Sequence, residues 1–176
     1  VFLGRLDAHV VALDAKTGKE LWKTQIIDYT GGSVITSPPT LVKNLVITGY
    51  GGGEYGVRGS IVALDQATGK EVWRTYTVPM GTEPGADTWK GDSGKNGGGV
   101  AWHIGSYDPK LNLVYYGTSN PSPWSASVRG NDSSDIGKFS NLYSASVLAL
   151  NADTGKISWH YQFTPHDVYD YDAVQI

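Results

Sequence analysis

One short pattern recurs three times in this chain and constrains its fold more than any other feature. The segments 10–22, 61–73 and 147–159 share the frame Ala-x-Asp/Asn-x-x-Thr-Gly-Lys-x-x-Trp. Each copy predicts an apolar strand, a tight turn closed by glycine, and a second strand that ends in tryptophan. A unit of this kind cannot bury its faces alone, so neighbouring units must stack. We expect the shared tryptophans to pack adjacent units together and not to contact a ligand (Trp22, Trp73 and Trp159).

The spacing of these tryptophans indicates a β-propeller. Trp22 and Trp73 are 51 residues apart, close to the ~40–50 residues of one propeller blade. Trp73 and Trp159 are 86 residues apart, which allows one blade with a large insertion or two blades of which one has a degenerate pattern. The predicted fold class is therefore all-β, with about three to four blades of a larger propeller.

Composition agrees with an all-β chain and excludes several functions. The 23 glycines and 6 tryptophans in 176 residues fit tight turns and aromatic packing better than helices. The net charge is −3 and the basic residues are scattered, so nucleic acid is not an expected partner. No apolar run is long enough to predict a membrane span, and the absence of cysteine excludes disulfides and zinc thiolate sites. Val1 falls within a predicted strand, so we expect residues 1–176 to be one partial propeller domain, truncated at both ends.

The glycine-rich stretch 51–59 isolates a single carboxylate. Glycine at 51, 52 and 53 lets the backbone approach a bulky group and adopt positive φ. Glu54 then projects one negative charge into that space. A solvated turn residue is the other interpretation of a lone glutamate among glycines.

Three further oxygen-bearing side chains lie beyond predicted strands. Asn120 follows the predicted strand 113–117 and precedes Pro121, whose fixed φ would hold the amide rigidly. Asp170 and Asp172 are two residues apart and share a face if the backbone is extended. Like charges side by side repel unless a cation lies between them, and hard metal ions take oxygen ligands of these types. Each residue alone is also typical of an ordinary turn or an exposed loop.

Two polar stretches are predicted to be loops. Residues 79–99 are rich in Gly, Pro, Asp and Lys, and a loop of this length is usually functional or disordered. Residues 125–141 are also polar, and we expect them to form a surface loop.

Together these motifs resemble the quinoprotein alcohol dehydrogenases, a family that uses pyrroloquinoline quinone (PQQ) and folds as an eight-bladed β-propeller. The repeat is similar to the tryptophan-docking motif of that family. Segment 52–59 resembles the loop that supplies a glutamate metal ligand, and segment 117–124 resembles the loop that supplies an asparagine ligand. Segment 97–102 resembles the one whose tryptophan lies beneath the quinone, and segment 164–170 the one that ends in the catalytic aspartate.

The resemblance implies a role for each of the residues singled out. The metal ligands would be Glu54, Asn120, Asp170 and Asp172. Asp170 would also be the catalytic general base. The cofactor would be bordered by a stacking ring, a hydroxyl and a glycine backbone (Trp102, Thr36, Gly51, Gly52 and Gly53).

Asp172 bears on the identity of the metal. In the calcium-type members, the residue two positions after the catalytic aspartate is usually small and uncharged, whereas a carboxylate there resembles the lanthanide-dependent branch. A trivalent ion gains more from one additional anionic oxygen than Ca²⁺ does. The expected cofactors are PQQ and a lanthanide ion, with Ca²⁺ as the alternative.

The resemblance implies oxidation of a small primary alcohol to an aldehyde, with hydride transfer to PQQ. It also implies a periplasmic location, a cytochrome c or similar electron acceptor, and a possible homodimer. Two alternatives use the same repeat: a non-enzymatic propeller scaffold or assembly protein, and a PQQ enzyme that acts on sugars or polyols. The coexistence of the four site types favours the alcohol dehydrogenase, because a scaffold needs none of them (Glu54, Trp102, Asn120 and Asp170).

Overall fold

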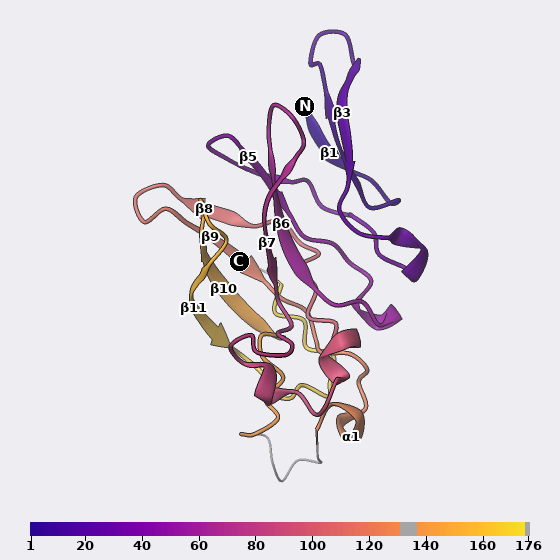
Figure 1. Ribbon diagram of the computed structural model, residues 1–176, viewed down its shortest axis with the longest axis vertical. Helices are drawn as coiled ribbons and strands as arrows, with labels where there is room; N and C mark the ends of the chain where they lie inside the picture. The colour runs from indigo at the N-terminus through magenta and orange to yellow at the C-terminus, as the bar shows by residue number, and fades with distance from the viewer. Residues whose placement is uncertain (131–136, 175–176) are drawn as a thin grey trace.

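The computed structural model describes residues 1–130 and 137–174, which form three antiparallel sheets in chain order (Figure 1). The polar run 131–135, within the loop expected at 125–141, lies outside the described residues. Within these ranges, no helix is long and apolar enough to cross a membrane. The all-β propeller prediction is confirmed, with a three-stranded sheet followed by two four-stranded sheets.

Each sheet is a meander of short strands. The first sheet contains β1 (Phe2–Gly4), β2 (His9–Leu13) and β3 (Glu20–Gln25). The second contains β4 (Thr40–Val42), β5 (Leu45–Thr48), β6 (Ser60–Asp65) and β7 (Glu71–Tyr76). The third contains β8 (Ser106–Asp108), β9 (Leu113–Gly117), β10 (Ser146–Asn151) and β11 (Ile157–Gln162). The helical pieces are the 3₁₀ helices η1 (Tyr29–Gly31), η2 (Gly53–Tyr55), η3 (Ala86–Thr88) and η4 (Ser93–Asn96), and the α-helix α1 (Ala126–Arg129).

The repeated turn has the same hydrogen bonds in all three copies. In the second copy, Oδ1 of Asp65 accepts hydrogen bonds from the Thr68 amide (2.9 Å), the Thr68 hydroxyl (2.7 Å) and the Ala67 amide (3.1 Å). Gly69 closes this turn at φ +71°, a conformation that glycine adopts without strain. Asn151 accepts the equivalent three bonds in the third copy, so an amide oxygen serves as well as a carboxylate.

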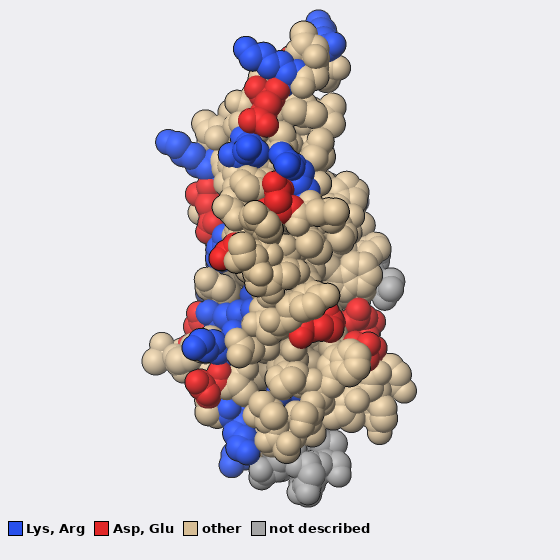
Figure 2. All heavy atoms as spheres, turned by 90° about the vertical axis from the view of Figure 1, so that its right-hand side faces the viewer, with Lys and Arg blue, Asp and Glu red and all other residues tan. Residues whose placement is uncertain are grey.

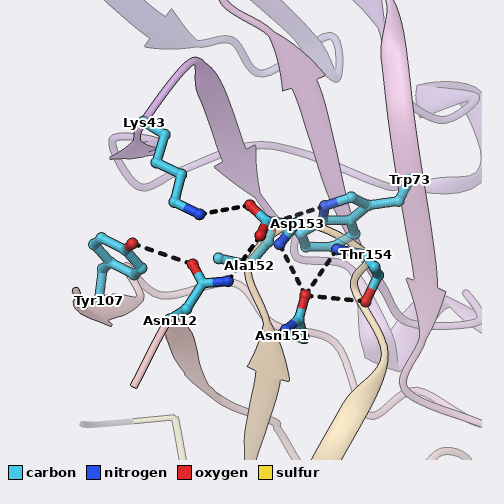
Figure 3. Close-up of polar contacts among 8 residues, drawn as sticks. All are labelled: Lys43, Trp73, Tyr107, Asn112, Asn151, Ala152, Asp153 and Thr154. Carbon is cyan, nitrogen blue, oxygen red and sulfur yellow. Dashed lines mark hydrogen bonds and ion pairs between the residues drawn. The ribbon is translucent and has the colours of Figure 1, made fainter. Parts of the chain in front are cut away.

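The tryptophans of the first two repeats join adjacent sheets, as expected. Trp73 Nε1 donates to the Ala152 carbonyl at 3.0 Å, and Thr75 Oγ1 donates to the Gly155 carbonyl at 2.6 Å (Figure 3 shows the first of these bonds). A Cβ on Gly155 would lie 2.4 Å from Cε3 of Trp73, so the indole packs directly on that glycine. Trp22 Nε1 and Thr24 Oγ1 donate in the same way to the Gln66 carbonyl (2.9 Å) and the Gly69 carbonyl (2.7 Å) of the second sheet. The role expected for Trp159 stays a prediction.

Polar side chains reinforce the joint between the second and third sheets. Lys43 Nζ lies 2.7 Å from Oδ1 of Asp153, and Asn112 Nδ2 donates to Oδ2 of the same carboxylate at 2.8 Å (Figure 3). These residues are exposed, so the ion pair contributes little on its own. These contacts link the second and third sheets beside the buried indole.

The middle sheet is buried on both faces. Along β6, Ile61 and Ala63 face an apolar cluster shared with the third sheet, while Val62 and Leu64 face a cluster shared with the first. This alternation follows from the two-residue period of a strand, with both faces apolar because both are covered. The clusters therefore pack the middle sheet face to face against the first and the third sheets.

The long gap between the second and third repeats is one blade with a large insertion, not two blades. Residues 77–105 run between β7 and β8 without adding a sheet of their own. This segment is tied to the core by Trp89, which is 4% exposed and donates from Nε1 to the Leu142 carbonyl at 2.5 Å. The insertion is thus an ordered part of the fold.

The expectation of a surface loop at 125–141 is wrong for part of this segment. Arg129 and Asn141 are both fully buried, and their side chains bond to each other. A polar segment can be buried when its donors and acceptors are paired internally.

Charges of both signs share one face of the molecule. On the face in Figure 2, Lys and Arg lie interspersed with Asp and Glu and do not gather into a basic patch.

Candidate functional site

A cleft of about 410 Å³ lies where loops of the first two sheets meet the segment after β11. It is lined by Thr36, Gly51, Gly52, Glu54, Val100, Trp102 and Asp172. Six of these seven residues are the ones that the sequence singled out, although they span 137 positions of the chain (36 to 172). The size falls within the range of small-molecule and cofactor sites, about 300–1,000 Å³.

The glycine stretch forms one wall of the cleft through its backbone. Gly51 donates to the Val34 carbonyl at 2.8 Å, which pairs it with the chain that enters the second sheet. Of the three adjacent glycines, Gly52 takes positive φ (+100°), and a Cβ there would lie 2.5 Å from the Gly32 carbonyl oxygen. Glycine is required at that position by both conformation and space.

Glu54 follows this turn within η2 and is exposed at the cleft. The carboxylate therefore projects from a segment whose backbone is fixed at both ends by positive-φ glycines, Gly52 (+100°) and Gly56 (+76°).

A second run of glycines links the glycine stretch to the loop after β9. Gly98 donates to the Val57 carbonyl at 3.0 Å, and Gly99 donates to the Asn120 carbonyl at 3.0 Å. A Cβ on Gly98 would lie 2.9 Å from Cβ of Ser122, so the three segments approach more closely than side chains allow. Chain segments far apart in the sequence are thereby held edge to edge behind the cleft.

Asp172 is fixed between Asn120 and Trp102. The Asn120 amide nitrogen donates to Oδ1 of Asp172 at 3.0 Å, and Trp102 Nε1 donates to Oδ2 at 3.3 Å. The next residue, Ala173, bridges to Thr118 at the end of β9. The carboxylate is therefore oriented from two sides while it still faces the cleft.

Trp102 is positioned at its backbone and at its ring. Its carbonyl accepts a hydrogen bond from Ser37 Oγ at 2.8 Å and a long one from Thr36 Oγ1 at 3.5 Å. Its ring meets the His103 ring edge to face, with centroids 5.6 Å apart and an interplanar angle of 77°. Ser37, His103 and Val100 were not predicted as site residues, because their contacts join positions up to 65 residues apart.

Asn120 carries an unpaired oxygen. The side chain is 2% exposed, and Oδ1 is buried with no hydrogen-bond partner anywhere in residues 1–130 and 137–174. Its Nδ2 donates to the Pro121 carbonyl at 3.3 Å, which leaves Oδ1 directed elsewhere. A buried amide oxygen without a partner costs roughly 1–3 kcal/mol, and coordination to a cation would remove that cost.

Asp170 lies beside these groups without lining the cleft wall. Its backbone is left-handed, with φ +62°. The pKa of Asp170 is raised above its usual range, first by partial desolvation and then by three nearby carboxylates (Asp172, Glu54 and Asp167). These interactions place Asp170, Asp172 and Glu54 in one region of negative potential.

The carboxylates do not form a closed cluster. Among the residues that the structure describes, no group of three or more His, Cys, Asp or Glu side chains is arranged to hold a metal ion. The convergence of Glu54, Asn120, Asp170 and Asp172 on one point therefore stays a prediction. Mutual repulsion keeps such carboxylates apart, whereas the Asp172 orientation and the unpaired Asn120 oxygen fit a hard cation.

The residues present thus fit both expected groups. The oxygen-only set of carboxylates and one amide suits a lanthanide or Ca²⁺. The cleft, with one indole and a glycine wall, suits a flat molecule that needs close backbone approach.

Comparisons with known proteins agree with these observations. Residues 26–175 match the family described as "PQQ: Glucose/ethanol/alcohol dehydrogenase, beta-propeller domain". The chain is 46% identical to quinohemoprotein alcohol dehydrogenase ADH IIB from Pseudomonas putida, over 99% of this chain and 26% of that protein. It is 44% identical to a lanthanide-dependent methanol dehydrogenase from Methylacidiphilum fumariolicum (strain SolV), over 99% of this chain and 30% of that protein.

A solved structure, a europium-containing methanol dehydrogenase, superimposes with a TM-score of 0.90 at 42% identity, covering 99% of this chain and 32% of that one. The chain therefore spans about a quarter to a third of the length of the relatives it matches. The family match covers most of this sequence and includes every residue of the candidate site. This chain belongs to the β-propeller domain family of the PQQ-dependent glucose, ethanol and alcohol dehydrogenases.

Proposed function

We propose that the protein containing this chain oxidises a small primary alcohol to an aldehyde, using PQQ and a metal ion in the cleft around Trp102 and Asp172. When bound, PQQ would accept hydride from the alcohol carbon, and the metal would act as a Lewis acid beside it. The observation that carries the proposal is the buried, unpaired Oδ1 of Asn120, whose backbone amide orients the Asp172 carboxylate.

The chain's own residues would divide the work of binding. Trp102 would offer its ring face to the flat cofactor and exclude water from one side of it. Gly51, Gly52 and Gly53 would allow close backbone approach, and the Thr36 hydroxyl would bind a cofactor carboxylate. Thr36, Gly51 and Gly52 all line the same cleft as Trp102, which supports these roles.

Four side chains would hold the metal through oxygen atoms: Glu54, Asn120, Asp170 and Asp172. Asp170 would also remove the hydroxyl proton of the alcohol as general base. Asp170 lies near Asp172 and Glu54, two of the proposed metal ligands. This position supports the role, because a general base must lie beside the bound alcohol.

Asp172 favours a lanthanide over Ca²⁺. Its two oxygens are held by Asn120 and Trp102, so adding it to the ligand set requires little reorganisation. Asp172 would add a third carboxylate to the ligand set, and an additional negative charge benefits a trivalent ion more than a divalent one. A name among the relatives agrees with this choice, since the methanol dehydrogenase from Methylacidiphilum is described as lanthanide-dependent.

The test is dye-linked alcohol oxidation by the full-length protein, supplied with PQQ and either La³⁺ or Ca²⁺. We expect wild type to be more active with La³⁺, and Asp172→Ala to lose the La³⁺ activity selectively. Asp108→Ala is the matched control, since it removes a carboxylate from the turn between β8 and β9. Equal activity of Asp172→Ala with both ions would remove Asp172 from the ligand set.

The same assay separates the alternatives. A propeller scaffold would show no PQQ-dependent oxidation with any ion, and an enzyme for sugars or polyols would prefer those substrates to ethanol. We further propose a cytochrome as electron acceptor and a periplasmic location. Support for the acceptor comes from a relative named methanol dehydrogenase [cytochrome c] subunit 1, which is 39% identical over 98% of this chain.

A further inference from the structure

The side chain of Arg129 is fully buried at the end of α1, and its guanidinium bonds to three segments of the chain. Its Nε donates to the Pro123 carbonyl at 2.5 Å, and Nη2 donates to the Trp124 carbonyl at 3.0 Å. These two carbonyls belong to the loop that begins at Asn120. The first segment held by the guanidinium is therefore the loop of a proposed metal ligand.

The second segment carries Asp170. Nη2 of Arg129 also donates to the Asp167 carbonyl at 2.6 Å. The Asp167 carboxylate, only 2% exposed, accepts from the Tyr169 amide at 2.8 Å and the Tyr171 amide at 2.7 Å. These two amides flank Asp170 and fix the left-handed turn (φ +62°) in which it lies. The guanidinium thus anchors the residue that in turn anchors Asp170.

The third segment is the return to the third sheet. Arg129 Nη1 donates to Oδ1 of Asn141, which is itself fully buried. Asn141 Nδ2 donates to the Thr88 carbonyl (3.1 Å) and the Arg129 carbonyl (3.2 Å), so this amide is paired at both ends. The network is therefore tied to the insertion that covers this side of the molecule.

We propose that Arg129 is a positioning residue that sets the separation between Asn120 and Asp170, and thereby the geometry in which a metal ion is held. This inference rests on the proposed function, because it assigns Arg129 to the same metal site. Only arginine can satisfy several carbonyls at fixed angles, since its planar guanidinium offers five donors. Lysine would keep the positive charge but not this geometry.

The experiment measures metal binding directly. Metal-free, full-length protein is titrated with Tb³⁺, and luminescence sensitised by tryptophan reports occupancy beside Trp102. Arg129→Met and Arg129→Lys are expected to weaken Tb³⁺ binding by about tenfold or more, the usual effect of losing a group that orients ligands. Arg129→Lys carries the test if Arg129→Met fails to fold.

Arg74→Met is the matched control. Arg74 is partly buried, and its guanidinium donates to Ser60, Glu71 and the Ile26 carbonyl. These contacts do not reach Asn120 or the Asp170 turn. The Arg74→Met variant should lower the thermal midpoint as Arg129→Lys does, while its Tb³⁺ affinity stays within twofold of wild type. A purely structural role for Arg129 predicts a different result for binding: both variants would unfold earlier, and both would bind Tb³⁺ with wild-type affinity.

Different results would overturn the proposed metal site and the positioning role of Arg129. If wild type shows no saturable Tb³⁺ luminescence, the proposed metal site is wrong, and the role of Arg129 falls with it. If wild type binds Tb³⁺ and Arg129→Lys binds equally well, only the positioning role is overturned.

Discussion

Trp102 and Asp172 are 70 residues apart in the sequence and are joined by a hydrogen bond from the indole nitrogen to a carboxylate oxygen, 3.3 Å long. The indole thus has two functions available, a ring face for stacking and an N–H that orients an acidic ligand. These functions separate by substitution.

Trp102→Phe keeps an aromatic face and removes the donor. We expect PQQ affinity to stay within a fewfold of wild type, while lanthanide affinity falls by about three- to tenfold, because Asp172 keeps only the Asn120 amide as its partner. Trp102→Leu should lose PQQ affinity as well. Isothermal titration of the full-length protein with each component measures both effects. If Trp102→Phe and Trp102→Leu lower PQQ affinity equally, the stacking role is wrong.

Asn120→Leu tests whether the unpaired oxygen serves binding and not stability. Oδ1 has no partner within the described residues, so an apolar side chain of similar volume should change the free energy of unfolding without metal by less than about 1 kcal/mol. Metal affinity should fall severely. The control is Asn141→Leu, which leaves buried Arg129 without one acceptor and should cost about 3 kcal/mol. Urea unfolding with and without La³⁺ gives both quantities, and a large loss of metal-free stability in Asn120→Leu would contradict the assignment.

Gly155→Ala measures the joint between the second and third sheets. The new Cβ would meet Trp73 at 2.4 Å in addition to the unfavourable φ of +71°. Gly81 has a similar φ of +62°, and a Cβ there would have no atom of the described residues within 4 Å. Gly81→Ala should therefore cost about 1 kcal/mol from backbone strain alone, and Gly155→Ala about 2 kcal/mol more. Equal losses in denaturant unfolding would show that the indole does not depend on this glycine.

The repeated turn predicts a specific sensitivity to acid. Hydrogen bonds from the Thr68 hydroxyl and backbone hold the pKa of Asp65 below its usual value of 3.8. A lowered folded-state pKa means that this contribution to stability is complete above about pH 4 and is lost as the pH falls through the folded-state value. Asp65→Asn should keep the turn, as Asn151 does in the third copy, and should flatten the decline in thermal midpoint below pH 4. An unchanged pH profile would show that Asp65 does not contribute to acid unfolding.

The repeat predicted the strands, the turns and the first two inter-sheet tryptophans correctly, because those features depend on local sequence and regular spacing. Trp73 and Gly155 follow directly from the shared frame. The 86-residue gap left two interpretations open, since an insertion and a degenerate blade have similar composition. The structure decides between them, because residues 77–105 add no sheet between β7 and β8.

The site was predicted through resemblance more than through spacing. Thr36, Glu54, Trp102 and Asp172 line one cleft, while their roles stay predictions. A solvated turn would explain Glu54 equally well from sequence alone. Arg129 was missed because it lies in a polar segment rich in Ser and Gly, where burial has no local signal. Its partners lie up to 38 residues away, and only the folded chain pairs them.

The pairing of Asn120 with Asp172 has a consequence for biosynthesis. Both residues follow strands of the third sheet, Asn120 after β9 and Asp172 after β11, and the bond cannot form until position 172 has emerged from the ribosome. The earlier portions of the nascent chain would present Glu54 and Asn120 without their acidic counterpart. Under the proposed function, ion capture at this site would therefore follow translation of this region and would come after synthesis of the sheets that precede it.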